Sequence, residues 1–281
     1  MNKYILTLDH MTAYVDWLKE EERTQATIEK YLHDIWAFVR WLHGRPVAKE
    51  LVMEWKQELL SAHRAPSTIN AALSALNGLF RFLGWEGFRT RFLKVQRRMF
   101  RDQSREMTRE DYRRLVSAAR RLERERLALL METICATGIR VSEVKYITVE
   151  AANHGRAEIA MKGKIRVILI AGKLCRKLQN YARKQKIASG EIFLTGSGKG
   201  LSRRQIWTEM KWLCKYAGVE PSHVFPHNLR HFFAVTFYRV CRDIAKLADM
   251  LSHSSIETTR IYLLTSGAEH QKYLERMGLV I

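Results

Sequence analysis

The sequence predicts a mainly α-helical fold with a small β-sheet, which is the α+β class. Its 281 residues include 47% hydrophobic and 10% aromatic residues but only four prolines, a composition typical of a folded, helix-rich chain. Apolar residues recur at helical spacing over most of the chain. Two β-rich runs around a glycine-containing turn, between residues 156 and 170, indicate one hairpin.

The first hundred residues predict a bundle of about four helices. Thr24 can cap a helix whose apolar stripe stops before Gly44. Pro66 can open another helix, which stops before Gly84. We therefore expect a helical domain over residues 1–98.

A basic segment follows this bundle. Residues 89–105 carry many cations and few core-forming side chains, as an exposed connector would. The capping box formed by Thr108 and Asp111 then restarts a helix. We therefore expect a linker over residues 99–106 and a second domain over residues 107–281. A charged run is most often a solvated surface, but in a basic protein this one can lie along DNA phosphates.

The second domain begins with a predicted helical stretch that runs through Leu115 to Cys135. A turn at Gly138 leads into a second predicted helix, which carries Arg140. The hairpin comes next, over residues 156–170.

Helical patterns dominate the rest of this domain. Glu191–Thr195 could first add a third short strand to the hairpin. Ser202 and Gln205 form another capping box at the start of the next predicted helix.

The charge balance points to a polyanionic partner. Lysine and arginine outnumber aspartate and glutamate by 48 to 29, a net charge of +19. Residues 1–100 hold 15 of these cations against 11 acids, and the rest of the chain holds 33 against 18, so +15 lies in the second part. A charge this large repels itself in the folded state, which favours nucleic acid as the partner over an anionic membrane.

Nothing in the sequence indicates export or a membrane span. No segment approaches eighteen consecutive apolar residues, and the first residues are too soon charged for a signal peptide. Cysteines are scattered without a C-x-x-C pair, which predicts buried free thiols rather than a zinc cluster or disulfides. We therefore expect a protein of a reducing cytoplasm. The cysteines are Cys135, Cys175, Cys214 and Cys241.

Covalent cleavage of a phosphodiester needs a nucleophile, cations on the non-bridging oxygens and an acid for the leaving alkoxide. Tyr262 is the candidate nucleophile, because it lies nine residues after His253 in a polar segment. Most tyrosines are structural, and this chain has ten. The position relative to His253 is what singles out Tyr262.

Two arginines are the candidate cations. Arg140, with Glu143 three residues on, could form a surface salt bridge in a helix. Alternatively, Arg140 is a buried guanidinium that Glu143 orients onto a phosphate. Arg230, three residues after His227, would supply a second planar, permanently charged fork.

The remaining candidates are a lysine and a pair of histidines. Lys162, in the hairpin turn, is the preferred general acid, and Lys164 competes for that role. His227 and His231 have the spacing of zinc ligands, but Asn228 replaces the general base of the H-E-x-x-H motif. Neither a Walker pattern nor a cluster of acids for magnesium is visible, so we expect no cofactor and no metal.

The order and spacing of these residues resemble the tyrosine recombinases, the phage integrase family that includes the Xer site-specific recombinases. The resemblance covers nearly the whole chain. Residues 1–98 are similar to the family's helical SAM-like core-binding domain, and residues 107–281 to its catalytic domain. Ser252 departs from the family pattern, in which glycine usually precedes the histidine. The positions that match the family's catalytic set are Arg140, Glu143 in a supporting role, Lys162, His227, Arg230, His253 and the nucleophile Tyr262.

The resemblance implies an enzyme that breaks and rejoins a specific site on double-stranded DNA. Tyr262 would form a 3′-phosphotyrosyl bond, and a homotetramer would exchange strands through a Holliday junction without ATP or metal. Accessory DNA-bending or directionality proteins are further expected partners, and no membrane is. The implied location is the cytoplasm, at the bacterial nucleoid. Residues 268–281 could form a helix that is exchanged between neighbouring subunits or one that packs on its own subunit.

Two other functions stay open at this point. One is a DNA-binding protein on the same scaffold that no longer cuts. The other is a type IB topoisomerase, which shares the tyrosine chemistry. The target site, and the choice between integration, excision and chromosome dimer resolution, are also open.

Overall fold

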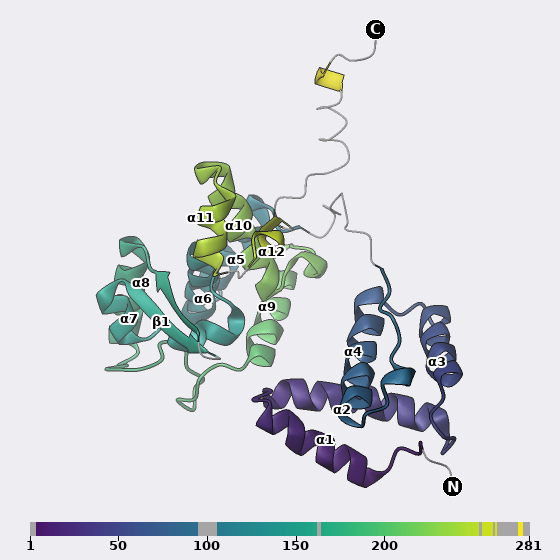
Figure 1. Cartoon of the computed structure of the whole chain (residues 1–281). Coiled ribbons are helices and arrows are strands. Elements are labelled where there is room, and N and C mark those ends of the chain that lie inside the picture. The colour runs from purple at the N-terminus through teal and green to yellow at the C-terminus, as the bar shows by residue number, and fades with distance from the viewer. Residues whose placement is uncertain are drawn as a thin grey trace. The chain divides into compact units, whose positions relative to one another are not determined.

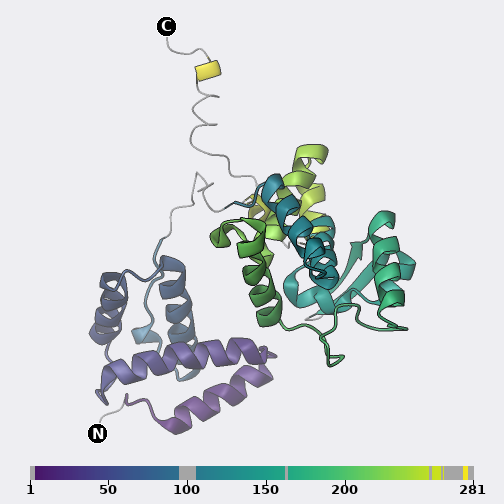
Figure 2. The same cartoon turned by 180° about the vertical axis from the view of Figure 1, so that it is seen from behind.

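The computed structural model describes residues 4–94, 106–161, 164–252, 255–260, 262 and 275–277. The chain divides into two compact units, residues 1–97 and 98–281 (Figures 1 and 2). Each unit has its own hydrophobic core. Residues 99–105 of the predicted linker lie outside the described residues, and so do Lys162, His253 and most of the predicted C-terminal helix.

The first unit is a helical bundle, as predicted. Thr24 is the N-cap of α2, although its hydroxyl bonds that of Thr27 rather than a backbone amide. Pro66 is the first residue of α4. The elements are α1 (Leu8–Glu20), α2 (Gln25–Leu42), α3 (Lys49–Ser61), α4 (Pro66–Phe82) and the 3₁₀ helix η1 (Glu86–Phe88). Tyr14, Phe38 and Phe80 lie fully buried at the centre of its core.

The second unit is mostly helical. Both predicted capping boxes are present, that of Thr108 and Asp111 before α5 and that of Ser202 and Gln205 before α9. Its helices are α5 (Arg109–Arg121), α6 (Glu125–Thr137), η3 (Val141–Tyr146), α7 (Val149–His154), α8 (Gly172–Lys184), α9 (Arg203–Ala217), η4 (Pro221–His223), α10 (Pro226–Cys241), α11 (Ile244–Leu251) and α12 (Ile256–Arg260).

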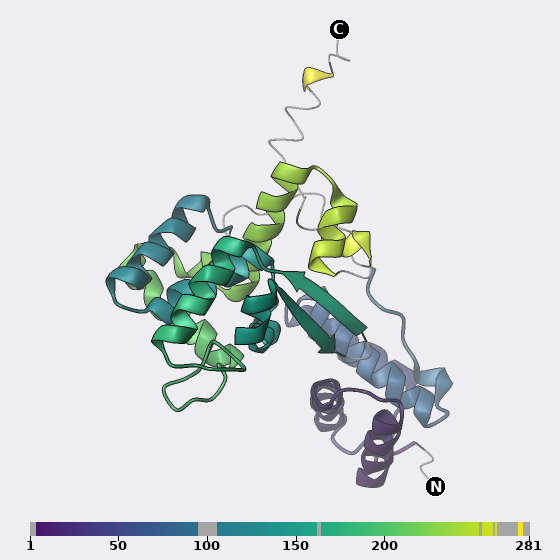
Figure 3. The ribbon, with the colours of Figure 1, turned by 90° about the vertical axis from the view of Figure 1, so that its left-hand side faces the viewer.

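The predicted hairpin is present as an antiparallel pair, β1 (Arg156–Met161) and β2 (Lys164–Leu169) (Figure 3). The predicted third strand at Glu191–Thr195 is wrong. Glu191 and Leu194 each form only an isolated bridge, so the sheet in the described part of the chain has two strands. Apolar alternation over so few residues is a weak local signal for a strand.

Helix α6 is the centre of the second unit. It packs against α5, α8 and α10, and Leu130, Met131 and Ile134 are fully buried. A helix surrounded on several sides fixes the position of the residues that follow it. The predicted α+β class is confirmed, because the fold is mainly helical and contains one hairpin.

The cysteines and the hydropathy of the helices complete the description. All four thiols are free; Cys175 and Cys214 are buried, whereas Cys135 and Cys241 are half-buried. Within the described ranges, none of the helices combines the length and the apolar character that crossing a membrane requires.

Candidate active site

The site begins where α6 ends. Gly138 caps α6 with a φ of +64°, the left-handed region that favours glycine. A Cβ at this position would lie 2.5 Å from the ring of Phe233 on α10 and 3.1 Å from Leu251 at the end of α11. Glycine therefore allows the end of α6 to approach both of those helices closely.

Arg140 follows two residues later and precedes a helix rather than lying within one. Its backbone is extended, and it caps the 3₁₀ helix η3. Glu143 accepts two hydrogen bonds from Arg140, one from the backbone N–H and one from Nη1 of the guanidinium, both at 2.9 Å. Glu143 is buried, whereas the Arg140 side chain is 41% exposed. The expected buried guanidinium is therefore an accessible one, held by a buried carboxylate.

Arg230 on α10 is the buried arginine of the site. Its Nη1 donates to the backbone oxygen of Gly138, and its Nη2 donates to that of Leu251 at 2.8 Å. It also forms a side-chain hydrogen bond with Tyr262, in which the phenolic oxygen accepts. Burial lowers the pKa of Arg230, and the charge of nearby Arg140 lowers it further.

Tyr262 lies beside two imidazole rings. Its ring centroid is 5.1 Å from that of His231 and 6.2 Å from that of His227. The side chain is buried in a small apolar cluster with Phe233 and Leu251. The structure thus brings the predicted nucleophile, one predicted histidine and Arg230 together, with His231 as an additional neighbour.

Two predicted residues cannot be placed against this cluster. Lys162 and His253 lie outside the described residues, and so does the side chain of Lys164. Ser252, next to His253 in sequence, ends α11 in the left-handed conformation with a φ of +48°.

Arg166 is a site residue that the sequence motifs did not single out. It lies on β2 opposite Ile159, and its side chain is only 10% exposed. Its Nη1 contacts Glu143 Oε1 at 3.2 Å and the Leu251 oxygen at 3.4 Å. Burial lowers the pKa of Arg166 to about 10, against the opposing effect of Glu143. A signal was available, because Arg166 stands two residues before buried Ile168 and so shares its side of the strand.

A cavity of about 430 Å³ adjoins these charged groups. Arg140, Glu143, Arg166 and Ser252 contribute to its wall, together with apolar residues of the hairpin. A cavity of this size, with the accessible guanidinium of Arg140 at its surface, can receive an anionic group such as a phosphodiester.

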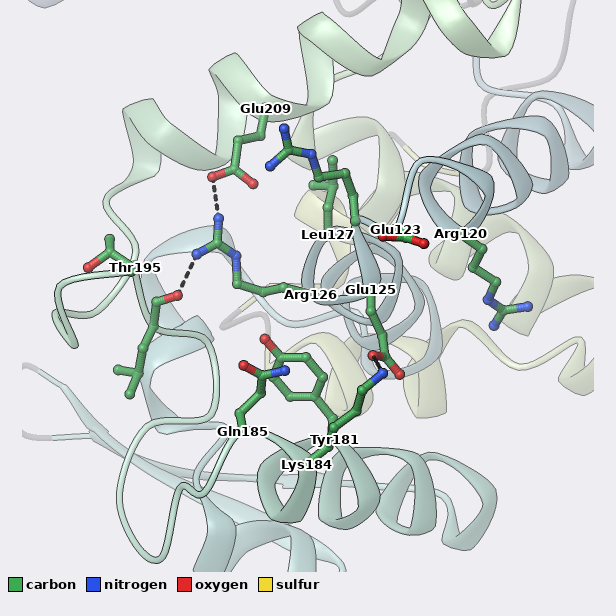
Figure 4. A pocket seen from close by; sticks show the side chains of 13 residues that line it. Arg120, Glu123, Glu125, Arg126, Leu127, Tyr181, Lys184, Gln185, Thr195 and Glu209 are labelled. Carbon is green, nitrogen blue, oxygen red and sulfur yellow. Dashed lines mark hydrogen bonds and ion pairs between the residues drawn. The ribbon is translucent and has the colours of Figure 1, made fainter.

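A larger cavity of about 920 Å³ lies elsewhere in the second unit, between the start of α6, α8 and α9 (Figure 4). Arg126 pairs there with Glu209 at 2.6 Å, and Lys184 pairs with Glu125 at 2.7 Å. None of the predicted catalytic residues lines it. Because Arg140 and Glu143 line the smaller cavity, the smaller cavity is the better candidate for the chemistry.

Comparisons with known proteins point to one family. The profile of the phage integrase family matches residues 105–268, and that of the phage integrase N-terminal SAM-like domain matches residues 11–87. The tyrosine recombinase XerC of Roseiflexus castenholzii is 30% identical over 284 aligned positions, gaps included. The alignment covers 90% of this chain and 88% of the relative.

Solved structures share the fold at lower identity. A lambda integrase tetramer bound to a Holliday junction is similar with a TM-score of 0.71 and 18% identity, over 92% of this chain and 78% of that one. The XerH recombinase bound to its difH substrate gives a TM-score of 0.67 at 18% identity, over 97% and 90%. The family profile spans more than half of the chain, and the XerC relative spans nearly all of it. This chain belongs to the phage integrase family of tyrosine recombinases.

Proposed function

We propose that this protein is a site-specific recombinase that cuts and rejoins double-stranded DNA through a 3′-phosphotyrosyl intermediate. The observation that carries the proposal is the contact between the Tyr262 phenol and the Arg230 guanidinium, beside a pair of imidazoles and the Arg140–Glu143 pair. A phenol in this setting has a cation to orient it and an imidazole to take its proton.

The chemistry can be written from these residues. The Tyr262 oxygen attacks the scissile phosphorus, the phenolic proton passes to an imidazole such as that of His227, and the bond from phosphorus to the 5′ oxygen breaks. Arg140 and Arg230 stabilise the charge that builds on the non-bridging oxygens. Lys162 protonates the leaving 5′ oxygen, and His253 completes the proposed set. A 5′ hydroxyl of the partner duplex then attacks the phosphotyrosine and restores the DNA.

The covalent bond conserves the energy of the broken phosphodiester, so the proposed reaction needs no nucleotide hydrolysis. We propose that four subunits act together on DNA, exchanging strands through a Holliday junction. The net charge of +19 supports a DNA partner, and the tetrameric lambda integrase on a Holliday junction supports the assembly. We place the protein in the cytoplasm, at the nucleoid, with accessory DNA-bending proteins as further partners. Residues 1–98 and 107–281 are the proposed core-binding and catalytic domains.

The test starts by finding the target. The protein is incubated with randomly fragmented DNA of its source organism and denatured with detergent, and the covalently attached fragments are sequenced. A duplex of the recovered site, nicked next to the cleavage position, then traps the adduct. Cleavage releases a short fragment with a 5′ hydroxyl, and once that fragment diffuses away the strand cannot be rejoined. Wild type is expected to accumulate this adduct. Absence of any wild-type adduct would favour a DNA-binding protein that no longer cuts.

Matched variants assign the nucleophile. Tyr262→Phe is expected to bind the same duplex with unchanged affinity and to form no adduct. Tyr238→Phe is the control, because Tyr238 packs against the same apolar cluster, and it is expected to form adduct as wild type does. Adduct from Tyr262→Phe would overturn the assignment. Relaxation of supercoiled plasmid carrying two sites, without any recombinant product, would point to a topoisomerase instead.

A further inference from the structure

Three guanidinium groups in this unit share two acceptors. Arg140 and Arg166 both donate to Oε1 of Glu143, at 2.9 and 3.2 Å. Arg166 and Arg230 both approach the backbone oxygen of Leu251, at 3.4 and 2.8 Å. Arg166 therefore connects the Arg140–Glu143 pair to the backbone oxygen that holds Arg230.

This arrangement does not serve stability. The cluster and the cavity beside it hold three guanidinium groups and two carboxylates, those of Glu143 and Asp249, which leaves a net charge of +1 before substrate binds. The Nε and Nη2 atoms of Arg166 are buried and have no hydrogen-bond partner in the described structure. Burying a cation with unsatisfied N–H groups costs free energy. Because Arg166 lowers stability at this position, its presence is better explained by a functional effect on the residues that it contacts.

We propose that Arg166 is a positioning residue, which fixes the spacing between the two phosphate-binding arginines, Arg140 and Arg230, by contacting Glu143 and the end of α11 through one nitrogen. This inference rests on the proposed recombinase function and adds to it. Arg166 acts through its neighbours because its two unpaired nitrogens are shielded from solvent. The accessible guanidinium is that of Arg140, which is 41% exposed where that of Arg166 is 10% exposed.

The physical reason for such a residue is the geometry of the transition state. Two planar forks can hold a pentacovalent phosphorus only if their separation matches it. Arg140 is anchored on η3 and Arg230 on α10, so neither sets the position of the other directly. Arg166, on β2, contacts the acceptors of both. The excess positive charge of the cluster is relieved when the phosphodiester enters.

The test measures single-turnover adduct formation on the nicked duplex at saturating DNA, with the dissociation constant measured separately. Arg166→Gln is expected to lower the rate about tenfold to a hundredfold, the scale of a misplaced catalytic group, with the dissociation constant unchanged within about twofold. Arg156→Gln is the control on the same hairpin, because Arg156 pairs with Glu158 at 3.4 Å but lies 60% exposed. The control is expected to cleave at the wild-type rate.

Two further variants separate positioning from folding and from charge. The effect of Arg166→Gln should largely vanish when Glu143→Gln is already present, because both changes break the same link. Arg166→Lys keeps the charge but has a shorter, non-planar end. It should fold and bind DNA like wild type yet cleave more slowly, which also covers the case in which Arg166→Gln does not fold.

The outcomes are distinguishable. If wild type forms no adduct, the proposed function fails. If wild type forms adduct and Arg166→Gln or Arg166→Lys matches its rate, the positioning role fails while the function stands. Additive effects of Arg166→Gln and Glu143→Gln would also overturn the inference, because they would place the two residues in independent roles.

Discussion

The Arg230 guanidinium donates a hydrogen bond to the phenolic oxygen of Tyr262. The same guanidinium is held by the backbone oxygens of Gly138 and Leu251. The proposed nucleophile thus contacts a group that, in the proposed mechanism, also binds the scissile phosphate. Because the contact is made within one subunit, this geometry supports attack by Tyr262 on a phosphate bound by its own subunit.

Replacing Arg230 by lysine should severely impair cleavage. A single ammonium cannot contact both backbone oxygens and a phosphate, so we expect a loss of about 3–4 kcal/mol of transition-state stabilisation, by analogy with removing an oxyanion-hole donor. Arg140→Ala should have an effect of similar size. The measurement is the rate of adduct formation on the nicked duplex. Arg239→Lys, on the exposed side of the same helix, serves as the control. Near-normal cleavage by Arg230→Lys would refute the proposed phosphate-binding role of Arg230.

Gly138→Ala should destabilise the second unit. The new Cβ would lie 2.5 Å from the Phe233 ring at a φ of +64°, so overpacking and backbone strain together should cost about 2–4 kcal/mol. Thermal and denaturant unfolding measure the loss. Gly196→Ala is the matched control, since a Cβ added there would have no atom within 4 Å; equal stability of the two variants would contradict the close approach of the helices.

Ser252→Gly should make the protein slightly more stable. Ser252 holds a φ of +48° at the end of α11. Glycine relieves the strain of this conformation but gains freedom in the unfolded chain, so the net gain should be about 0.5–1 kcal/mol. Unfolding midpoints of the two proteins check this value. A loss of stability would mean that the serine hydroxyl, which contacts the Asp249 oxygen at 3.4 Å, outweighs the strain.

The capping box of α5 should make stability depend on acid pH. Burial raises the pKa of Asp111, but hydrogen bonds from Thr108 and the proximity of His223 outweigh it, so the pKa is lowered from 3.8. A carboxyl with a lowered folded-state pKa stabilises the fold above its unfolded pKa and loses that contribution as pH falls through the folded value.

Asp111→Asn should therefore lower the unfolding temperature near pH 7, and the difference from wild type should shrink below about pH 4. Thermal unfolding from pH 3 to pH 7 measures the trend. Glu110→Gln, which alters an exposed pair with Arg114 at 3.4 Å, is the control. A difference that stays constant down to pH 3 would show that the Asp111 charge contributes nothing.

DNA binding should weaken steeply with salt. Each phosphate that a cation neutralises releases bound counterions, so a protein with about six such contacts should lose about a thousandfold in affinity between 50 and 200 mM salt. The dissociation constant on the recovered site, measured over this range, gives the slope. A shallow slope would disagree with a DNA partner for the +19 charge.

The sequence predicted the helices best where their ends carry local signals. Thr108 and Ser202 are capping residues as expected, because capping depends on side chains within three positions. The strand expected at Glu191–Thr195 failed because strand pairing depends on a distant partner edge. Arg140 was expected within a helix, yet Gly138 ends α6 and leaves Arg140 extended before a 3₁₀ helix.

In the candidate site, too, local sequence signals were predictive and contacts with distant residues were not. Motif order singled out Arg230 and Tyr262, which the fold brings into contact. Arg166 was missed because its role depends on acceptors 23 and 85 positions away in sequence. Strand alternation predicts that Arg166 lies on the inner side of β2. It does not predict that the Glu143 carboxylate lies beside it.

The two acceptors that hold Arg230 are backbone oxygens, those of Gly138 and Leu251. Every amino acid supplies such an oxygen, so these hydrogen bonds constrain where the ends of α6 and α11 lie and not which side chain Leu251 carries. Gly138 is constrained separately, by its positive φ and by the nearby Phe233 ring. A substitution at Leu251 should therefore release Arg230 only where it displaces the backbone.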